Sequence, residues 1–284
     1  MRKITEGIYY EDTYPGVTLG ALLLPQGTVL IDAPLRVEDA RSWKAALLSL
    51  GGHFNRLLVN LDSHPDRTLG ARAMECTIVA HHKTAQVFRG RPSVFKGQNT
   101  ESGAEWETQN DTVGTRWAIP DITFTQNMTL YWGPPDVLIE HHPGPVAGAI
   151  WVAIPSAEVV FVGDAVLPNL PPFLAGADIP TWVDTLDLLK TSYKNFTIVS
   201  GRGGPISQEV VRDQQIELRN ILKGLERLAK RNVSPEETSN LIPSLLADLK
   251  FPKRLEEQYT QRLHHGLQQY YTRHYRPSEA SEPD

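Results

Sequence analysis

The sequence predicts an α/β (α+β) fold followed by a helical extension. Through the first 200 residues, short apolar runs typical of strands alternate with segments of helical spacing. From Ser207 onward only helical patterns remain. The chain has 284 residues, of which 40% are hydrophobic, and this is enough to bury a core without disulfides or a structural metal.

The signals for strands and helices follow one another along the first part of the chain. The expected strands are residues 17–24, 28–31, 56–61, 77–80, 122–125, 128–131, 137–141, 149–154, 159–162 and 197–200. The expected helices between them are residues 37–50, 69–74, 84–88 and 182–189. Residues 90–116 are polar and rich in glycine, so we expect a long loop there with some helix.

Three helices are predicted in the C-terminal part. The first carries an apolar stripe that includes Val211, Leu218 and Leu225. The sequence SPEE at 234–237 is a capping box with proline at the first helical position, which predicts a second helix. Residues 253–274 form the third. We therefore expect one domain at 1–205, a helical extension packed on it at 206–276, and a disordered tail at 277–284.

Composition excludes several classes of function. A net charge of −5 and a pI of about 6.0 argue against nucleic acid as a partner, because phosphate binding needs a basic face. No stretch approaches the roughly 18 apolar residues of a membrane span. The N-terminus lacks a signal peptide, and Cys76 stands alone, so we expect a cytoplasmic protein with no membrane partner and no disulfides.

Four segments at the ends of predicted strands concentrate His, Asp, Arg and Gly. They are DSHPDR at 62–67, HHPGP at 141–145, GD at 163–164 and GRGG at 201–204. Alternate residues of a tight loop can converge on one point, so Asp62, His64 and Asp66 could share a cation. Each of the aspartates, taken alone, could instead be a loop carboxylate that caps backbone N–H groups.

In their order and spacing these four motifs resemble the metallo-β-lactamase superfamily, which carries HxHxDH, PGHTxG, a strand ending in GD and a late GHG. The opening strands and the turn at Asp32 are also similar, and the resemblance covers about residues 7–205. It implies an αββα sandwich. It also implies hydrolysis at two metals, usually zinc, that share a bridging water.

Only some of the family's metal-ligand positions hold metal-binding residues in this sequence. Four of the seven ligand positions hold residues able to coordinate a metal, namely Asp62, His64, Asp66 and Asp164. The other three hold Pro145, Arg67 and Arg202, and neither proline nor a protonated guanidinium can act as a ligand. We expect the two arginines to occupy the second-metal region and to pair with Asp66 and Asp164, because unpaired buried charges are costly. Whether the protein is an enzyme stays open.

Three functions compete at this stage. The first is a metal-poor or metal-free protein that binds a small anionic molecule through Arg67 and Arg202. In this anion-binding hypothesis, His142 lies at the mouth of the site, as a hydrogen-bonding residue or a proton shuttle. The second is a hydrolase of esters, lactones, thioesters or phosphoesters with one divalent ion, Mn, Zn or Mg. The third is a non-enzymatic scaffold.

In the hydrolase interpretation, Asp62, His64 and Asp164 hold the ion. The catalytic residues are then Asp66, which orients the water, together with Asp164 and His64, while an arginine stabilises the oxyanion. The cleft would have apolar walls from residues 171–178 and from Trp106, Trp117 and Trp132.

The third C-terminal helix carries a broad apolar stripe, formed by Tyr259, Leu263, Leu267, Tyr270 and Tyr271. A stripe of this size is a liability when it is exposed. We therefore expect the C-terminal helices either to cover the sandwich or to form a homodimer.

Overall fold

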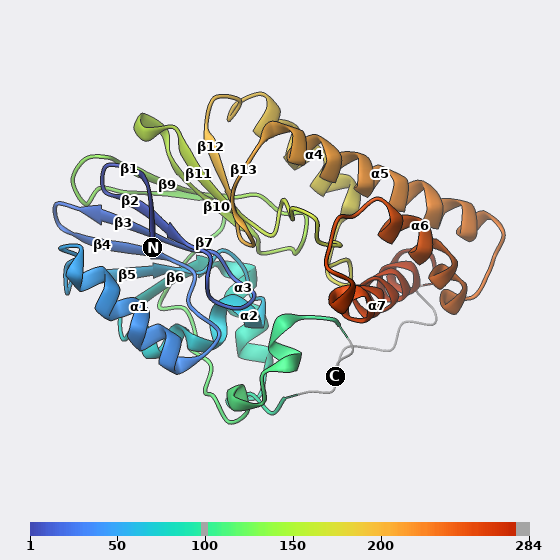
Figure 1. Cartoon of the computed structure of the whole chain (residues 1–284), viewed down its shortest axis with the longest axis horizontal. Helices are drawn as coiled ribbons and strands as arrows, with labels where there is room; N and C mark the ends of the chain where they lie inside the picture. Colours follow the sequence, from blue (N-terminus) through green and yellow to red (C-terminus); the bar gives the residue numbers. More distant parts are fainter. Residues whose placement is uncertain (98–101, 277–284) are drawn as a thin grey trace.

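Two mixed β-sheets pack face to face in the computed structural model, and helices cover the outer face of each sheet (Figure 1). This is the αββα arrangement that the sequence motifs predict. The structure describes residues 1–97 and 102–276, so the tail expected at 277–284 lies outside the described residues.

The first sheet contains seven strands in chain order. They are β1 (Arg2–Thr5), β2 (Ile8–Glu11), β3 (Leu19–Leu24), β4 (Gly27–Ile31), β5 (Arg56–Val59), β6 (Thr77–His81) and β7 (Ile122–Phe124). Strands β1 to β4 are antiparallel, and β4 to β7 are parallel. The helices of this half are α1 (Val37–Ser49), α2 (Pro65–Thr68), the 3₁₀ helix η1 (Leu69–Met74) and α3 (His82–Gly90).

The second sheet has the order β13-β12-β11-β10-β9-β8. Its strands are β8 (Asn127–Leu130), β9 (Val137–His141), β10 (Ile150–Ile154), β11 (Val159–Gly163), β12 (Thr197–Ser200) and β13 (Gly204–Ile206). Only β11 and β12 pair in parallel. The 3₁₀ helix η4 (Pro155–Ala157) joins β10 to β11, and α4 (Ile179–Lys190) precedes β12.

Alternation of side chains along the strands builds the layers. In β4, Val29 and Ile31 point into the core between the sheets, whereas Leu30 packs with Trp43 of α1 on the outer face. In β11, Phe161 faces the other sheet, and Val160 faces the helices on the outside. Both faces of these strands are buried, which is why they read as continuous apolar runs.

Three helices follow β13 and pack on the second sheet. They are α5 (Gln208–Lys230), α6 (Ile242–Ala247) and α7 (Glu256–Tyr275), with 3₁₀ helices η5 (Pro235–Leu241) and η6 (Lys253–Leu255) between them. The apolar stripe predicted for the third helix is buried within the chain: Tyr259, Leu263, Leu267, Tyr270 and Tyr271 are at most 3% exposed. The stripe thus covers the sandwich and no longer argues for a homodimer.

Some local predictions differ from the structure. The segment after Ser234 forms a 3₁₀ helix before α6 begins, and the side chain of Ser234 makes no capping hydrogen bond. Pro243 lacks a backbone N–H and would fall inside an α-helix running on from Pro235, so it prevents one continuous α-helix there. Strands β1, β2 and β13 were not expected, because their short segments mix polar residues, glycine or proline with few apolar ones. The long loop contains 3₁₀ helices η2 (Glu105–Thr108) and η3 (Asn110–Thr112).

Within the described ranges, none of the helices combines the length and the apolar character that crossing a membrane requires.

Leu267→Ala tests the packing of α7 on the sandwich. Leu267 is fully buried among side chains of the second sheet and of α4 and α5. We expect its truncation to lower the free energy of unfolding by about 2–5 kcal/mol, because a cavity remains. Urea denaturation measures this change. Gln269→Ala, at an exposed position on the same helix, should change stability by less than about 0.5 kcal/mol. Equal effects of the two variants would mean that α7 does not dock as described.

Candidate functional site

The candidate site lies at one edge of the sandwich, where strands from both sheets end. Asp32 follows β4, the loop at 60–64 and helix α2 follow β5, Asp164 follows β11, and Arg202 follows β12. Because β4 and β5 are parallel in one sheet and β11 and β12 in the other, their carboxyl ends meet at the same edge. The four motifs found in the sequence are thereby brought to this edge.

Arg67 is the most deeply buried charge of the site, with a side chain that is 0% exposed. Its Nη1 donates to Oδ2 of Asp32 at 2.8 Å, and its Nη2 donates to Oδ1 of Asp164. Its Nε lies 3.2 Å from Oδ1 of Asp62. All three nitrogens therefore face carboxylates, and Arg67 acts as the centre of a three-way ion pair rather than as a free anion-binding group.

Two glycines make room for this guanidinium. A Cβ on Gly201 would lie 2.8 Å from Nη1 of Arg67 and 2.8 Å from the backbone carbon of Gly163. Gly163 itself has a φ of +58°, and a Cβ there would lie 3.3 Å from the same nitrogen. The glycines in the GD and GRGG motifs thus serve the packing of Arg67.

Arg202 contacts two of the carboxylates that the sequence analysis assigned to the metal site. Its Nε and Nη2 donate to the two oxygens of Asp164 at 3.1 and 3.2 Å, and its Nη1 donates to Oδ2 of Asp66 at 3.0 Å. Its Nη2 also lies 3.2 Å from Nδ1 of His64. The predicted pairing with Asp66 and Asp164 is therefore present, with Arg202 engaging both and Arg67 engaging Asp164.

Two charged residues of the site were missed by sequence reasoning, Glu105 and Arg262. The carboxylate of Glu105 accepts from Nη1 of Arg202 at 2.6 Å and lies 3.3 and 3.5 Å from Nη2 of Arg262. Arg262 comes from α7 and also donates to the carbonyl of Gly103 at 2.6 and 3.1 Å. Arg262 could have been found, because an arginine that falls within the predicted apolar stripe of α7 must have a partner in the core. The polar segment around Glu105 offers no such signal.

Phe173 packs against the guanidinium groups of both Arg202 and Arg262, whose central carbons are 4.7 and 4.1 Å from the ring centroid. The ring of His64 lies 4.6 Å away from it. The apolar loop at 171–178 therefore does form a wall of the site, and its Phe173 makes cation–π contacts with both arginines.

The expected tryptophan wall is only partly present. The backbone N–H of Trp106 donates to Oδ1 of Asp66 at 2.7 Å, and its ring packs with Phe95 behind the site. Trp117 belongs to the same aromatic group. Trp132 was misplaced: it packs against Gly27, at the turn between β3 and β4.

Arginines depress the pKa of two carboxylates. Burial alone would raise the pKa of Asp164, but Arg202 and Arg67 lower it below the usual range for aspartate. Burial would likewise raise the pKa of Glu105, and Arg202 and Arg262 lower it instead. Both groups are carboxylates at neutral pH.

The remaining carboxylates are less fully compensated. Burial raises the pKa of Asp32 to about 7 against the effect of Arg67, and it raises the pKa of Asp66 to about 7 against that of Arg202. The pKa of Asp62 is also raised, first of all by burial. Burial and the nearby Arg202 lower the pKa of His64 well below 6.5, so its imidazole is neutral.

The donor set in this arrangement does not fit a metal ion. Both oxygens of Asp164 accept from guanidinium groups, and Nδ1 of His64 faces Arg202 as well as the backbone N–H of Asp66. Across residues 1–97 and 102–276, no group of three or more His, Cys, Asp or Glu side chains is placed to hold a metal. Positive charge at this edge comes from arginine instead.

His142 lies apart from this network. Its Nε2 is 3.6 Å from Glu140, and its ring packs on Trp151 at 4.0 Å. Its contacts are thus with β9 and β10, and the structure does not bring it to either arginine.

A cavity of about 290 Å³ opens beside the network. Arg202 and Glu105 contribute to its wall, together with Tyr14, Lys250 and Tyr259. The side chain of Glu105 is 23% exposed, whereas that of Arg202 is only 4% exposed. Glu105 therefore stands between Arg202 and the solvent.

An αββα sandwich with its polar site at the shared strand edge defines a metallo-hydrolase-like class of protein. The family model of the metallo-β-lactamase superfamily matches residues 64–201, which supports membership of that superfamily. A search of curated proteins finds no match.

Solved structures show the same fold. The stereoselective inverting sec-alkylsulfatase Pisa1 from Pseudomonas sp. matches with a TM-score of 0.65 at 14% identity, over 99% of this chain and 52% of that one. This chain thus spans about half the length of the alkylsulfatase. DIM-1 metallo-β-lactamase matches with a TM-score of 0.59 at 14% identity, over 77% and 96% of the two chains. A metallo-β-lactamase from Pontibacter korlensis gives 0.56 at 20% identity, over 77% and 97%.

Arg67→Met tests the central ion pair. The variant keeps much of the volume and removes the charge that faces Asp32, Asp62 and Asp164. We expect a loss of about 3–5 kcal/mol in the free energy of unfolding at pH 7, because buried carboxylates are left unpaired. Arg212→Met, at an exposed position of α5, is the control and should change little. A loss below about 1 kcal/mol for Arg67→Met would contradict the central role of this residue.

Gly201→Ala tests the space left for Arg67. The added methyl group would lie 2.8 Å from the backbone carbon of Gly163 and 2.8 Å from Nη1 of Arg67. The backbone cannot move aside without distorting the strand end, and the guanidinium is fixed by its ion pairs. We expect a loss of about 1–3 kcal/mol, measured by urea denaturation. Gly90→Ala, where a Cβ meets nothing within 4 Å, should not be destabilising.

Proposed function

We propose that this member of the metallo-β-lactamase superfamily is metal-free at its strand-edge site and binds a small anion there. The anion would be a carboxylate, sulfate or phosphate group held between Arg202 and Arg262. In the ligand-free protein the carboxylate of Glu105 occupies that place. Hydrolase activity, which the family and its relatives suggest, is not part of the proposal.

The observation that carries the proposal is the position of Glu105. Its carboxylate accepts from Arg202 at 2.6 Å and lies 3.3 Å from Nη2 of Arg262, as a bound anion would. Two guanidinium groups from different elements, converging on one carboxylate, form a strong anion-binding arrangement. The adjoining cavity of about 290 Å³ gives a small molecule access to it.

Arg67 and Arg202 take different parts in this proposal. Arg202 contacts the anion directly, because it lines the cavity. Arg67 is fully buried and holds Asp164 in place, so that Asp164 in turn orients the Nε and Nη2 of Arg202. Asp66 fixes Nη1 from the other side. Arg67 thus contributes by positioning.

Glu105→Gln is the direct test of anion binding. Removing the internal carboxylate charge should strengthen binding of phosphate, sulfate or malonate roughly tenfold, equivalent to about 1.4 kcal/mol. Isothermal titration calorimetry of the wild type and the variant measures this. Arg262→Gln should weaken the same binding at least tenfold, since one of the two guanidinium groups is lost.

Glu38→Gln, at an exposed position of α1, is the matched control and should leave anion affinity unchanged. If neither the wild type nor Glu105→Gln binds any of the three anions at millimolar concentration, the proposal is wrong. The scaffold interpretation would then stand.

Thermal melting with and without chelator tests the metal-free state. We expect EDTA to leave the melting temperature of the wild type unchanged, because Asp164 is compensated by guanidinium groups. Arg202→His should behave differently: it offers an imidazole in place of a cation, so added zinc or manganese should raise its melting temperature. A drop of several degrees for the wild type in EDTA would instead favour the single-metal hydrolase, with the ion on Asp62, His64 and Asp164.

A further inference from the structure

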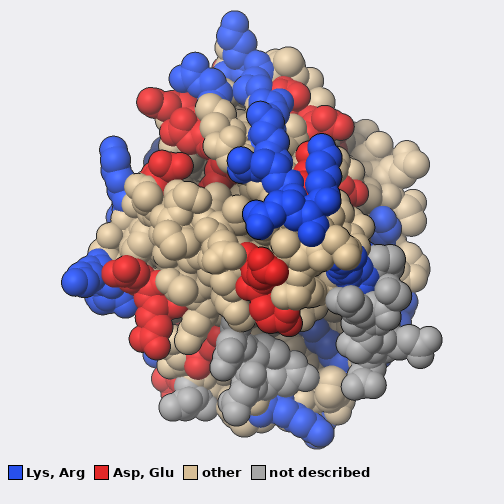
Figure 2. All heavy atoms as spheres, turned by 90° about the vertical axis from the view of Figure 1, so that its right-hand side faces the viewer, with Lys and Arg blue, Asp and Glu red and all other residues tan. Residues whose placement is uncertain are grey.

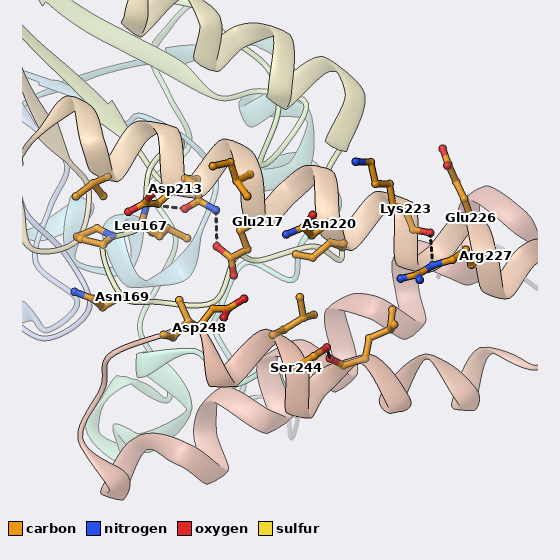
Figure 3. Close-up of a pocket in the computed structure, with 18 of the residues that line it drawn as sticks. Leu167, Asn169, Asp213, Glu217, Asn220, Lys223, Glu226, Arg227, Ser244 and Asp248 are labelled. Atoms are coloured by element: carbon orange, nitrogen blue, oxygen red, sulfur yellow. Dashed lines mark hydrogen bonds between the residues drawn. The ribbon is translucent and has the colours of Figure 1, made fainter.

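A second and larger cavity, of about 870 Å³, lies between α5 and α6, in the helical extension (Figure 3). Its walls include Leu167, Ile221, Leu241, Leu245 and Leu249. Charged residues of both signs line the rest of the cavity, so it can contact both an apolar body and a charged group of a small organic molecule.

Glu217 of α5 is the polar group that most needs a partner in this cavity. Its Oε2 accepts from the side-chain nitrogen of Gln214 at 3.1 Å, and Gln214 is itself fixed by the backbone N–H of Leu167 at 3.0 Å. Its Oε1 is buried and has no hydrogen-bond partner within the described part of the chain. An unsatisfied buried carboxylate oxygen is costly, so it marks a place where a donor is missing.

Two further carboxylates lie at the same end of the cavity. Asp213 precedes Glu217 by one turn of α5, and Asp248 follows α6. Figure 3 shows Glu217 and Asp248 directed toward one another across the cavity. Burial, then repulsion from Asp248, raises the pKa of Glu217 to about 8. A cation placed here would relieve both the missing hydrogen bond and the repulsion.

The other end of the cavity carries the opposite charge. Lys223, Glu226 and Arg227 lie at this end (Figure 3), and Lys230 also lines the cavity. Figure 2 shows that basic side chains gather on this side of the molecule, next to acidic ones. A ligand with positive charges at both ends would be repelled there, so a single cationic group with an apolar body fits best.

We propose that the cavity between α5 and α6 binds an amphipathic monoamine. Its ammonium group donates to Oε1 of Glu217 beside Asp213 and Asp248, and its apolar body lies along Ile221, Leu241 and Leu245. This site is separate from the strand-edge network and does not depend on the function proposed for it.

The test uses the full chain and probes that share one apolar body. Calorimetric titration at pH 8 with n-octylammonium, n-octanol, octanoate and spermidine separates the contributions of head group, chain and charge number. We expect octylammonium to bind at least tenfold more tightly than octanol. Octanoate and spermidine should bind weakly. Equal binding of octylammonium and octanol would overturn the proposal, and so would no binding of octylammonium.

Glu217→Gln removes the charge at nearly constant shape and should weaken octylammonium binding at least tenfold. Glu209→Gln, at an exposed position on the same helix outside the cavity, is the matched control and should not change the affinity. Melting curves verify that each variant is folded. Ser244→Trp, at an exposed position of the cavity wall, blocks the space without touching Glu217 and should also abolish binding. Unchanged affinity in both Glu217→Gln and Ser244→Trp would overturn the proposal.

Proton release gives a readout that a purely apolar site would not show. The free carboxyl carries a proton below its pKa of about 8, and the ammonium favours the ionised form, so binding must release a proton at lower pH. The other charged groups lining the cavity are Asp213, Asp248 and Glu226 and the basic Lys223, Arg227 and Lys230. We expect octylammonium affinity to rise at least tenfold from pH 6 to 8 in the wild type and to stay flat in Glu217→Gln. A flat profile in the wild type would contradict the assignment.

Discussion

The compensation of Asp164 by two guanidinium groups is the constraint on which the strand edge depends. Arg67 and Arg202 both bind it, Arg67 from helix α2 after the first sheet's β5 and Arg202 from the turn after the second sheet's β12. Since an arginine stays protonated at any physiological pH, this positive charge belongs permanently to the fold. The edge is thereby held together across the two sheets, because Asp164 follows β11 and Arg67 lies in the helix after β5.

The network nevertheless contains more carboxylates than arginines. Asp32, Asp62, Asp66, Asp164 and Glu105 face Arg67, Arg202 and Arg262, which leaves a net charge of −2 when all are ionised. The excess is relieved by protonation at the least compensated positions. This is why burial can raise the pKa of Asp32 and Asp66 to about 7, while the pKa of the doubly paired Asp164 falls.

The sandwich could be predicted from the sequence, and so could those site residues that belong to the four motifs. Asp66, Arg67, Asp164 and Arg202 come directly after apolar strands, so their convergence follows from the topology. Glu105 and Arg262 could not be placed in this way. One lies in a loop without periodicity and the other on a helix about 60 residues beyond the last strand, and their meeting depends on how the extension docks.

Docking of α7 and the state of the strand edge are coupled through one short segment. Gly103 has a φ of +64°, its carbonyl accepts from Arg262, and a Cβ there would lie 2.3 Å from the carbonyl oxygen of Gln258. Three residues later, the N–H of Trp106 donates to Asp66. Residues 103–106 are therefore clamped between the extension and the sandwich, with Glu105 in the middle. Under the proposed function, an anion that displaced the Glu105 carboxylate would act on the segment that joins these two contacts, so its binding would be linked to the docking of the helical extension.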